Sequence, residues 1–133
     1  MVVDTSALLA IAYSEDGHED FERAIETDAT RLLSAASALE AAIVMTSRAG
    51  TANEQQVLTE LDRLVVSLGL TIESVTPSQA LLAREAYLHF GKGRHRAGLN
   101  FGDCFAYALA KESGEPLLFK GDDFLHTDIV PRA

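Results

Sequence analysis

The chain has 133 residues, a formal net charge of −9 and 47% hydrophobic residues. A chain of this length fits one domain, residues 1–133, with a buried core, and this composition excludes an intrinsically disordered protein. The N-terminus lacks the features of a signal peptide and no apolar run is long enough to span a membrane, so we expect a cytoplasmic protein with no membrane partner. The 20 acidic against 11 basic residues argue against broad electrostatic binding of nucleic acid.

The first half of the chain alternates short apolar segments with helical patterns. Met1 to Asp4 is an apolar run that ends in a carboxylate, which predicts a strand. Thr5 and Ser6 are N-cap residues by type and predict a helix from Ala7 to Ala12. The next predicted elements are a helix at His18 to Thr27, a strand at Arg31 to Ser34, and a helix capped by Ser37 that runs to Arg48, with Leu39, Ala42, Ile43 and Met45 as its apolar members and Gly50 at its end.

The second half continues the alternation. Apolar residues recur at spacings of three and four, which predicts an amphipathic helix over Thr51 to Leu68. The next predicted elements are a strand at Leu70 to Val75, a helix from Thr76 to Phe90, a loop from Gly91 to Gly98, a helix that begins after Asn100, a strand at Pro116 to Phe119 and a last strand at Asp128 to Val130. This order predicts an α/β fold with a mainly parallel sheet covered by helices on both faces.

The helix capped by Asn100 carries an aspartate, Asp103, among large apolar residues. Its apolar face is formed by Phe101, Cys104, Phe105, Ala108 and Leu109. Asp103 lies in the first turn, where a negative charge is favourable toward the helix dipole. A buried charge also needs a partner, which is either a basic side chain or a metal ion. Cys104 is the only cysteine, so it can form neither an internal disulfide nor a thiolate metal site.

Other acidic residues stand at the ends of predicted elements. Asp4 and Asp122 both follow a predicted strand, and sites in parallel sheets form at the carboxyl ends of strands. Glu40 and Asp123 complete the set. Clustered carboxylates repel one another, and only a cation makes their proximity stable near neutral pH. Because Mg²⁺ prefers oxygen ligands and needs only a few carboxylates, convergence of this set with Asp103 predicts a metal site suited to phosphodiester hydrolysis.

Four motifs follow one another along the chain. They are Val3-Asp4-Thr5-Ser6 at the N-terminus, Ser37-Ala38-Leu39-Glu40-Ala41, Asn100-Phe101-Gly102-Asp103-Cys104, and Gly121-Asp122-Asp123-Phe124 after a strand. Each motif alone is weak, whereas their order, spacing and the total length are fairly specific. Together they resemble the PIN-domain ribonucleases, and most closely the VapC-type toxins of bacterial toxin–antitoxin pairs. The resemblance covers essentially the whole chain.

The resemblance implies a three-layer α/β/α fold and a Mg²⁺-dependent endoribonuclease in which Mn²⁺ can substitute. It assigns the catalytic and metal-binding roles to Asp4, Glu40, Asp103 and Asp122. The candidates for orienting water or phosphate are Thr5, Ser6, Asn100, Lys120 and Asp123. Lys120 stands where many family members have Thr or Ser, and which of the two adjacent aspartates faces the site stays open, with the motif alignment favouring Asp122.

The resemblance also implies two protein partners. One is a second copy of the chain in a homodimer. The other is a VapB-type antitoxin whose C-terminal segment packs on the toxin and places a basic side chain in the acidic site, where it compensates the carboxylates as a metal does.

A short basic segment is the candidate contact for RNA. It runs from His89 to Arg96 and contains Lys92, Arg94 and Arg96. The same segment also suits a solvated loop, just as the cap candidates and the acidic turn suit ordinary structural roles.

Two other functions compete with the ribonuclease. A phosphotransferase of the aspartyl-phosphate type would use Asp4 at the strand end, but it usually needs a second Asp where this chain has Ser6. A PIN-like protein–protein interaction module without catalysis would keep the fold alone, and metal binding discriminates between that module and an enzyme.

Overall fold

The computed structural model describes residues 1–132, and Ala133, the last residue of the predicted domain, lies outside them. Its centre is a parallel four-stranded sheet in the order β3-β2-β1-β4. The strands are β1 (Val2–Val3), β2 (Leu32–Ser34), β3 (Thr71–Glu73) and β4 (Leu117–Leu118). Val2 pairs with Leu32 on one side and with Leu117 on the other, so β1 is an interior strand. The predicted parallel sheet is confirmed.

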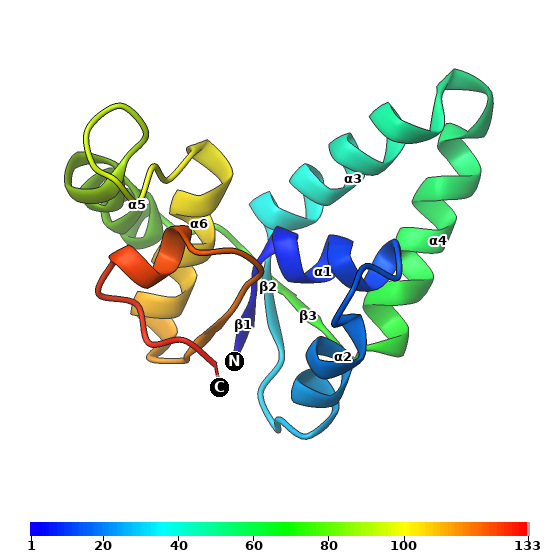
Figure 1. Cartoon of the computed structure of the whole chain (residues 1–133), viewed down its shortest axis with the longest axis horizontal. Helices are drawn as coiled ribbons and strands as arrows, with labels where there is room; N and C mark the ends of the chain where they lie inside the picture. The colour runs from blue at the N-terminus through cyan, green and yellow to red at the C-terminus, as the bar shows by residue number, and fades with distance from the viewer. Residues whose placement is uncertain (133) are drawn as a thin grey trace.

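Helices cover both faces of this sheet (Figure 1). One face carries α1 (Thr5–Ala12), α2 (His18–Glu26), α3 (Ala35–Ala49) and α4 (Glu54–Ser67); the other carries α5 (Pro77–Phe90) and α6 (Phe101–Ser113). Successive strand residues point to opposite faces, which explains the division. Val2 belongs to the core with α5 and α6, whereas Val3 belongs to the core with α1, α3 and α4. The predicted three-layer arrangement is therefore confirmed.

The strand order creates one place where the chain changes direction across the sheet. From β1 the chain proceeds to β2 and β3 on one side and then crosses to β4 on the other. Ligand sites in open α/β sheets lie at such a switch point, outside the carboxyl ends of the strands. Two hydrogen bonds join β1 and β4 there: Asp4 N–H donates to Leu118 O at 2.9 Å, and Lys120 N–H donates to Ser6 Oγ at 2.9 Å. The two candidate segments thus meet.

Two helix starts differ from the sequence prediction. The first helix begins at Thr5, because Asp4 itself is the N-cap and its carboxylate accepts from Ser6 N–H. The helix α3 begins at Ala35, because Ser34 has extended backbone and its hydroxyl accepts from Ala36 N–H at 3.2 Å. Ser37, the predicted cap, lies fully buried in the first turn instead. The predicted starts after Thr76 and Asn100 are confirmed.

Two predicted elements differ from expectation: one helix is divided, and the last strand does not form within residues 1–132. The helix predicted over Thr51 to Leu68 is divided into a 3-10 turn (Thr51–Asn53) and α4, because Asn53 has a non-helical backbone. The last predicted strand is absent from residues 1–132, where the segment 128–131 makes only a single parallel bridge between Pro131 and Leu117. Pro131 has no N–H to extend such pairing. A 3-10 turn (Asp123–His126) follows β4.

Several apolar side chains that the periodicity placed on buried faces are exposed. Phe101 is 81% exposed, Leu39 is 62% exposed and Ile43 is 58% exposed, whereas Met45 is buried. Each of the three exposed side chains lies on a helix whose buried stripe is narrower than its apolar stripe. None of the helices in the described part of the chain is long and apolar enough to cross a membrane.

Candidate active site

Asp4 lies at the switch point, between the end of β1 and the start of α1. It is 2% exposed, and its Oδ2 accepts hydrogen bonds from Ser6 N–H at 2.9 Å and from the Ser6 hydroxyl at 2.5 Å. Its other oxygen, Oδ1, is buried and has no hydrogen-bond partner within residues 1–132. A buried polar atom without a partner costs about 1–3 kcal/mol, so this oxygen is positioned to take a ligand.

The hydroxyl-bearing residues after Asp4 have different surroundings. Ser6 donates its hydroxyl proton to Asp4 and accepts from Lys120 N–H, so it orients the carboxylate and fixes the end of β4. Thr5 is buried and donates to Ser37 O at 3.3 Å, which joins α1 to α3. The hydroxyl of Ser6 therefore lies beside the carboxylate, and that of Thr5 is engaged with the backbone of the neighbouring helix.

Asp103 is held at the start of α6 by a reciprocal capping box. Asp103 N–H donates to Asn100 Oδ1 at 2.8 Å, and Asn100 N–H donates to Asp103 Oδ2 at 2.9 Å. Such a box satisfies two N–H groups that a helix start leaves without partners. The hydrogen bond uses one oxygen of the carboxylate. As at Asp4, the local backbone orients the acid and leaves the second oxygen for another contact.

Glu40 reaches the same site from α3. Its carboxylate lies directly against Gly102, and a methyl group built on Gly102 would overlap Glu40 Oε2. Any larger residue at this position would displace the acid, so the absence of a side chain at Gly102 creates the space that Glu40 fills. Gly102 was missed by the sequence reasoning. The signal available was a glycine inside the first turn of a helix, where glycine is unfavourable without a packing reason.

The carboxylates act on one another electrostatically. Burial raises the pKa of Asp103 to about 7, against the opposing effect of the hydrogen bond from Asn100, and the negative charges of Asp4, Glu40 and Asp123 contribute to the rise. Burial also raises the pKa of Asp4 above its ordinary value. The hydrogen bonds from Ser6 oppose this rise, and the negative charge of Glu40 adds to it. The fold therefore brings three predicted quartet members within mutual electrostatic range.

The fourth acidic position lies in the turn after β4. Asp122 and Asp123 are both exposed, and the charge that acts on Asp103 is that of Asp123. The assignment of the fourth ligand to Asp122 stays a prediction. Lys120 pairs with Glu15 through its ammonium group, so its proposed phosphate contact requires it to leave that partner.

The site contains the kinds of side chain that bind a divalent cation, but these side chains are not yet arranged around a single point. Within residues 1–132, no three Asp, Glu, His or Cys side chains are already arranged around one point as a metal site. Two observations nevertheless fit a cation that favours oxygen: the partnerless Asp4 Oδ1, and the recess at Gly102 that admits a carboxylate.

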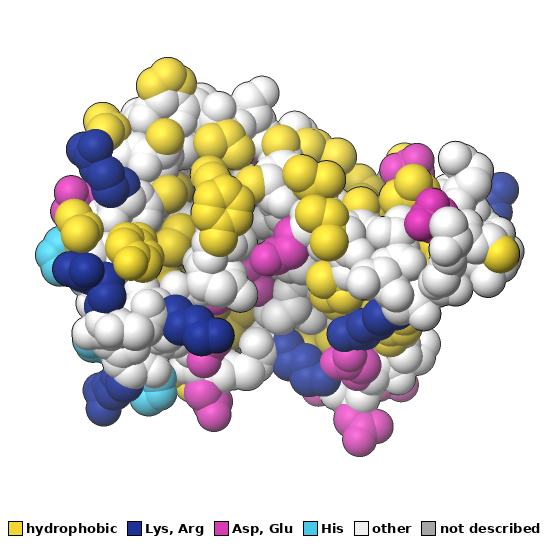
Figure 2. Space-filling model, turned by 90° about the horizontal axis from the view of Figure 1, so that it is seen from above, with side chains coloured by type: hydrophobic (Ala, Val, Ile, Leu, Met, Phe, Trp, Pro, Cys, Tyr) yellow, Lys and Arg dark blue, Asp and Glu magenta, His cyan; other side chains and the backbone are white. Residues whose placement is uncertain are grey.

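One of the basic residues predicted to contact RNA, Lys92, lines a common groove with Asn100 at the edge of this site. Lys92, Arg94 and Arg96 are exposed on a loop whose ends are pinned by backbone hydrogen bonds, Lys92 N–H to Leu99 O at 2.9 Å and Leu99 N–H to Phe90 O at 2.9 Å. Figure 2, which looks onto the carboxyl-end edge of the sheet, shows acidic side chains in a central hollow with hydrophobic side chains on both sides and basic ones farther out. The site is thus acidic at its centre.

Comparisons with known proteins agree with this geometry. The PIN-domain family model matches residues 1–130. Ribonuclease VapC30 of Mycobacterium tuberculosis is 54% identical over 130 residues, which are 98% of this chain and 96% of that protein. The crystal structure of M. tuberculosis VapC20, a sarcin–ricin-loop-cleaving toxin, aligns with a TM-score of 0.68 at 19% identity over 98% of both chains. A toxin–antitoxin complex from Klebsiella pneumoniae aligns with a TM-score of 0.66 at 16% identity over 96% of this chain and 92% of that one.

The two solved structures share the fold, and the sequence relative shares most of the chain at high identity. The fold and the acidic switch point define a nuclease-like α/β protein. The chain belongs to the PIN-domain family and, within that family, to the VapC-type members. The resemblance seen in the four sequence motifs is confirmed.

Proposed function

We propose that this protein is a metal-dependent endoribonuclease that acts as the toxin of a toxin–antitoxin pair. The observation that carries the proposal is the convergence of Asp4, Glu40 and Asp103 at the switch point of the sheet, where burial and then the charges of Asp4 and Glu40 raise the pKa of Asp103. A structural role alone gives no reason for one buried and two half-buried carboxylates to share a site. The family's ribonuclease members support RNA as the substrate, and action on RNA is consistent with the expected cytoplasmic location.

A divalent cation would be held by Asp4, Asp103 and Glu40, with Asp122 or Asp123 as the fourth acid. Mg²⁺ suits these oxygen ligands, and Mn²⁺ suits the same set. When bound, such a cation supplies charge neutralisation and an activated water for phosphodiester hydrolysis. The residues of the chain hold the ligands in place: Ser6 fixes one oxygen of Asp4 and leaves Oδ1 turned away from the cap.

Asn100 performs the equivalent task for Asp103. Its backbone N–H holds Asp103 Oδ2, so the carboxylate is oriented before a cation arrives. Because the pKa of Asp103 is raised to about 7, this carboxyl would have to lose a proton to hold a cation near neutral pH. Lys120 and the basic loop would contact phosphates of the RNA on either side of the acidic centre.

The partners follow from the same site. An antitoxin segment with an Arg or Lys side chain would neutralise the buried carboxylates and exclude the cation. The chain would also form a homodimer. Leu39 and Ile43 support this part of the proposal, since both are exposed apolar side chains on one face of α3, and such surface is usually covered by a partner.

The proposal is tested by incubating purified, antitoxin-free protein with total bacterial RNA in Mg²⁺, Mn²⁺ or a chelator. We expect discrete cleavage products in either metal and none in chelator. The matched variant is Asp103→Asn, which removes a ligand charge, keeps the shape of the side chain and should abolish cleavage. Cleavage at the wild-type rate by a folded Asp103→Asn protein would contradict the proposal. A folded wild-type protein that neither binds metal nor cleaves RNA would favour an interaction module.

A further inference from the structure

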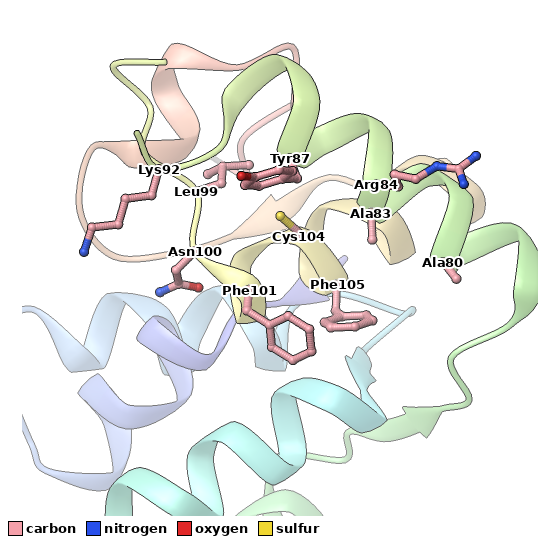
Figure 3. A pocket seen from close by; sticks show the side chains of 10 residues that line it. All are labelled: Ala80, Ala83, Arg84, Tyr87, Lys92, Leu99, Asn100, Phe101, Cys104 and Phe105. Carbon is pink, nitrogen blue, oxygen red and sulfur yellow. The ribbon is translucent and has the colours of Figure 1, made fainter. Parts of the chain in front are cut away.

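Beside the acidic site lies a groove that the catalytic carboxylates do not use. It occupies about 500 Å³ between α5 and α6, and its floor and walls are almost entirely apolar. Figure 3 shows the rings of Phe101 and Phe105 on one side of the groove, the ring of Tyr87 on the opposite side and the sulfur of Cys104 between them. A volume of this size falls in the range of about 300–1,000 Å³ that small organic ligands occupy.

Phe101 is the most unusual residue of this groove. It is 81% exposed, although it stands at the first position of a helix whose other large apolar residues are covered. Its ring meets that of Phe105 edge to face, at a centroid distance of 4.9 Å. Because most of the Phe101 side chain is exposed, its ring has a face available for stacking.

The charges at the rim differ from those of the chain as a whole. Of the lining residues that the structure describes, Arg84 and Lys92 are basic and none is acidic, although the chain has 20 acidic and 11 basic residues. Arg94 adds a third cation, with its guanidinium 5.5 Å from the centre of the Tyr87 ring. An apolar groove with a basic rim is complementary to a flat aromatic ligand that carries negative charge at its edges.

The groove adjoins the acidic site directly. Asn100 and Phe101 line it, and the backbone N–H of Asn100 holds the carboxylate of Asp103. We propose that the groove binds an unpaired nucleobase of single-stranded RNA, next to the phosphodiester bond at the carboxylates, with Phe101 as the stacking platform. The assignment rests on the proposed ribonuclease function. Stacking on aromatic rings is how proteins bind the bases of unpaired RNA, and the flanking cations would contact the adjacent phosphates.

The same charges argue against other occupants. Two copies of the chain that met groove to groove would bring the cations Arg84, Lys92 and Arg94 of each copy toward those of the other, and like charges across an interface are unfavourable. A basic antitoxin segment would meet the same repulsion at this rim, whereas the acidic centre beside it would attract that segment.

The test compares two fluorescent probes, a short oligouridylate and an abasic ribose–phosphate chain of the same length. Binding is measured by fluorescence anisotropy in chelator, so that neither probe is cleaved. The wild-type protein should bind the oligouridylate roughly tenfold more tightly, since stacking of one base contributes about 1–3 kcal/mol. Phe101→Ala should remove this preference and leave the affinity for the abasic chain unchanged.

Two control variants separate stacking from general effects. Lys92→Ala should weaken both probes by the same factor, because a cation contacts the backbone that they share. Val66→Ala, which shortens a side chain of similar exposure (78%) on α4, should change neither affinity. The oligomeric state of each variant is measured by analytical ultracentrifugation.

Two results would overturn the assignment. The first is equal or absent binding of the two probes to the wild-type protein. The second is a Phe101→Ala protein that retains the preference for bases; if its mass in solution also changes, the groove is a self-association surface. If the wild-type protein cleaves total RNA but shows no base preference, the proposed base-binding groove fails and the proposed ribonuclease function is kept. If it prefers bases but cleaves no RNA in metal, the ribonuclease function fails and base binding by the groove is kept.

Discussion

Asp4 and Asp103 occupy comparable places and illustrate two ways to build an acidic site. Each stands at the start of a helix, and each commits Oδ2 to a nearby residue, Ser6 in one case and Asn100 in the other. They differ in burial. Asp4 is almost completely enclosed and retains a partnerless Oδ1, whereas Asp103 is half-buried and exposed to the charges of the other acids.

The difference shows what each position contributes. Asp4 is fixed by the fold on all sides, so its location depends on β1, β4 and α1 together. Asp103 is fixed by its own helix start, and its proton affinity depends on the acids around it. Each side chain thus caps its helix with one oxygen and would bind a cation with the other. Holding these negative charges close together without a cation is unfavourable.

The largest expected effect comes from removing the charge at the enclosed position. Asp4→Asn keeps an acceptor for Ser6 but loses the anionic oxygen, so RNA cleavage should fall by more than about 100-fold. The metal-free variant should unfold at the same or a higher temperature, because an unpaired buried charge is gone. Cleavage rates and thermal unfolding measured in parallel check both parts. A large loss of unfolding temperature would show that the charge is structural.

The protonation of Asp103, the half-buried acid, should make the stability of the protein depend on pH. The pKa of Asp103 in the folded protein, about 7, lies above its ordinary value of 3.8, so the folded state holds a proton that the unfolded state releases. The free energy of unfolding of the metal-free protein should therefore fall as pH rises from about 4 to 7. After a discount for solvent screening, Asp103→Asn should reduce this fall by about 2 kcal/mol. Urea unfolding at pH 5 and 8 measures it.

The control for this pH effect is Asp16→Asn, a substitution of an exposed aspartate outside the site. It should leave the pH dependence of unfolding unchanged. Identical slopes for the wild-type and Asp103→Asn proteins would mean that Asp103 does not hold a proton at neutral pH.

A smaller effect is expected where Glu40 meets α6. Gly102→Ala places a methyl group where the Glu40 carboxylate lies, and it should weaken Mn²⁺ binding by about tenfold while helix propensity favours Ala by about 1 kcal/mol. The same substitution in a Glu40→Ala background should leave Mn²⁺ affinity unaltered, because the displaced group is already absent. An equal loss in both backgrounds would show that the methyl group acts on something other than Glu40.

The smallest expected effect on cleavage concerns Asp122 and Asp123, and it should show which of the two is the fourth acid of the site. Because the charge of Asp123 acts on Asp103, Asp123→Asn should lower cleavage several-fold. Asp122→Asn, the matched variant one position earlier, should change it less than about twofold if Asp123 is the fourth acid. The reverse ranking would restore the assignment that the motif alignment favours.

Local signals predicted most of the elements because local chemistry decides them. The starts after Thr76 and Asn100, and the end at Gly50, follow from capping rules alone. The choice of Ser34 over Ser37 as the cap of α3 could not be predicted in this way, since both have the right side chain. It depends on where β2 stops pairing, which is a property of the sheet.

The site was predictable in part for the same reason. The identities of Asp4, Glu40 and Asp103 follow from motifs, but the contact between Glu40 and Gly102 joins α3 to α6 and leaves no trace in either segment alone. The exposure of Phe101 was also missed, because helical periodicity describes the stripe of apolar residues and not how much of it the neighbouring helix covers.

The enclosed carboxylate of Asp4 and the half-buried carboxylate of Asp103 should together bind one divalent cation. Calorimetric titration of Mn²⁺ into purified, partner-free protein tests it without any assumption about the RNA. Saturable binding by the wild-type protein that is lost in folded Asp4→Ala and Asp103→Ala variants is the predicted result. A folded wild-type protein that binds no Mn²⁺, or variants that bind it as well as the wild type, would contradict the account.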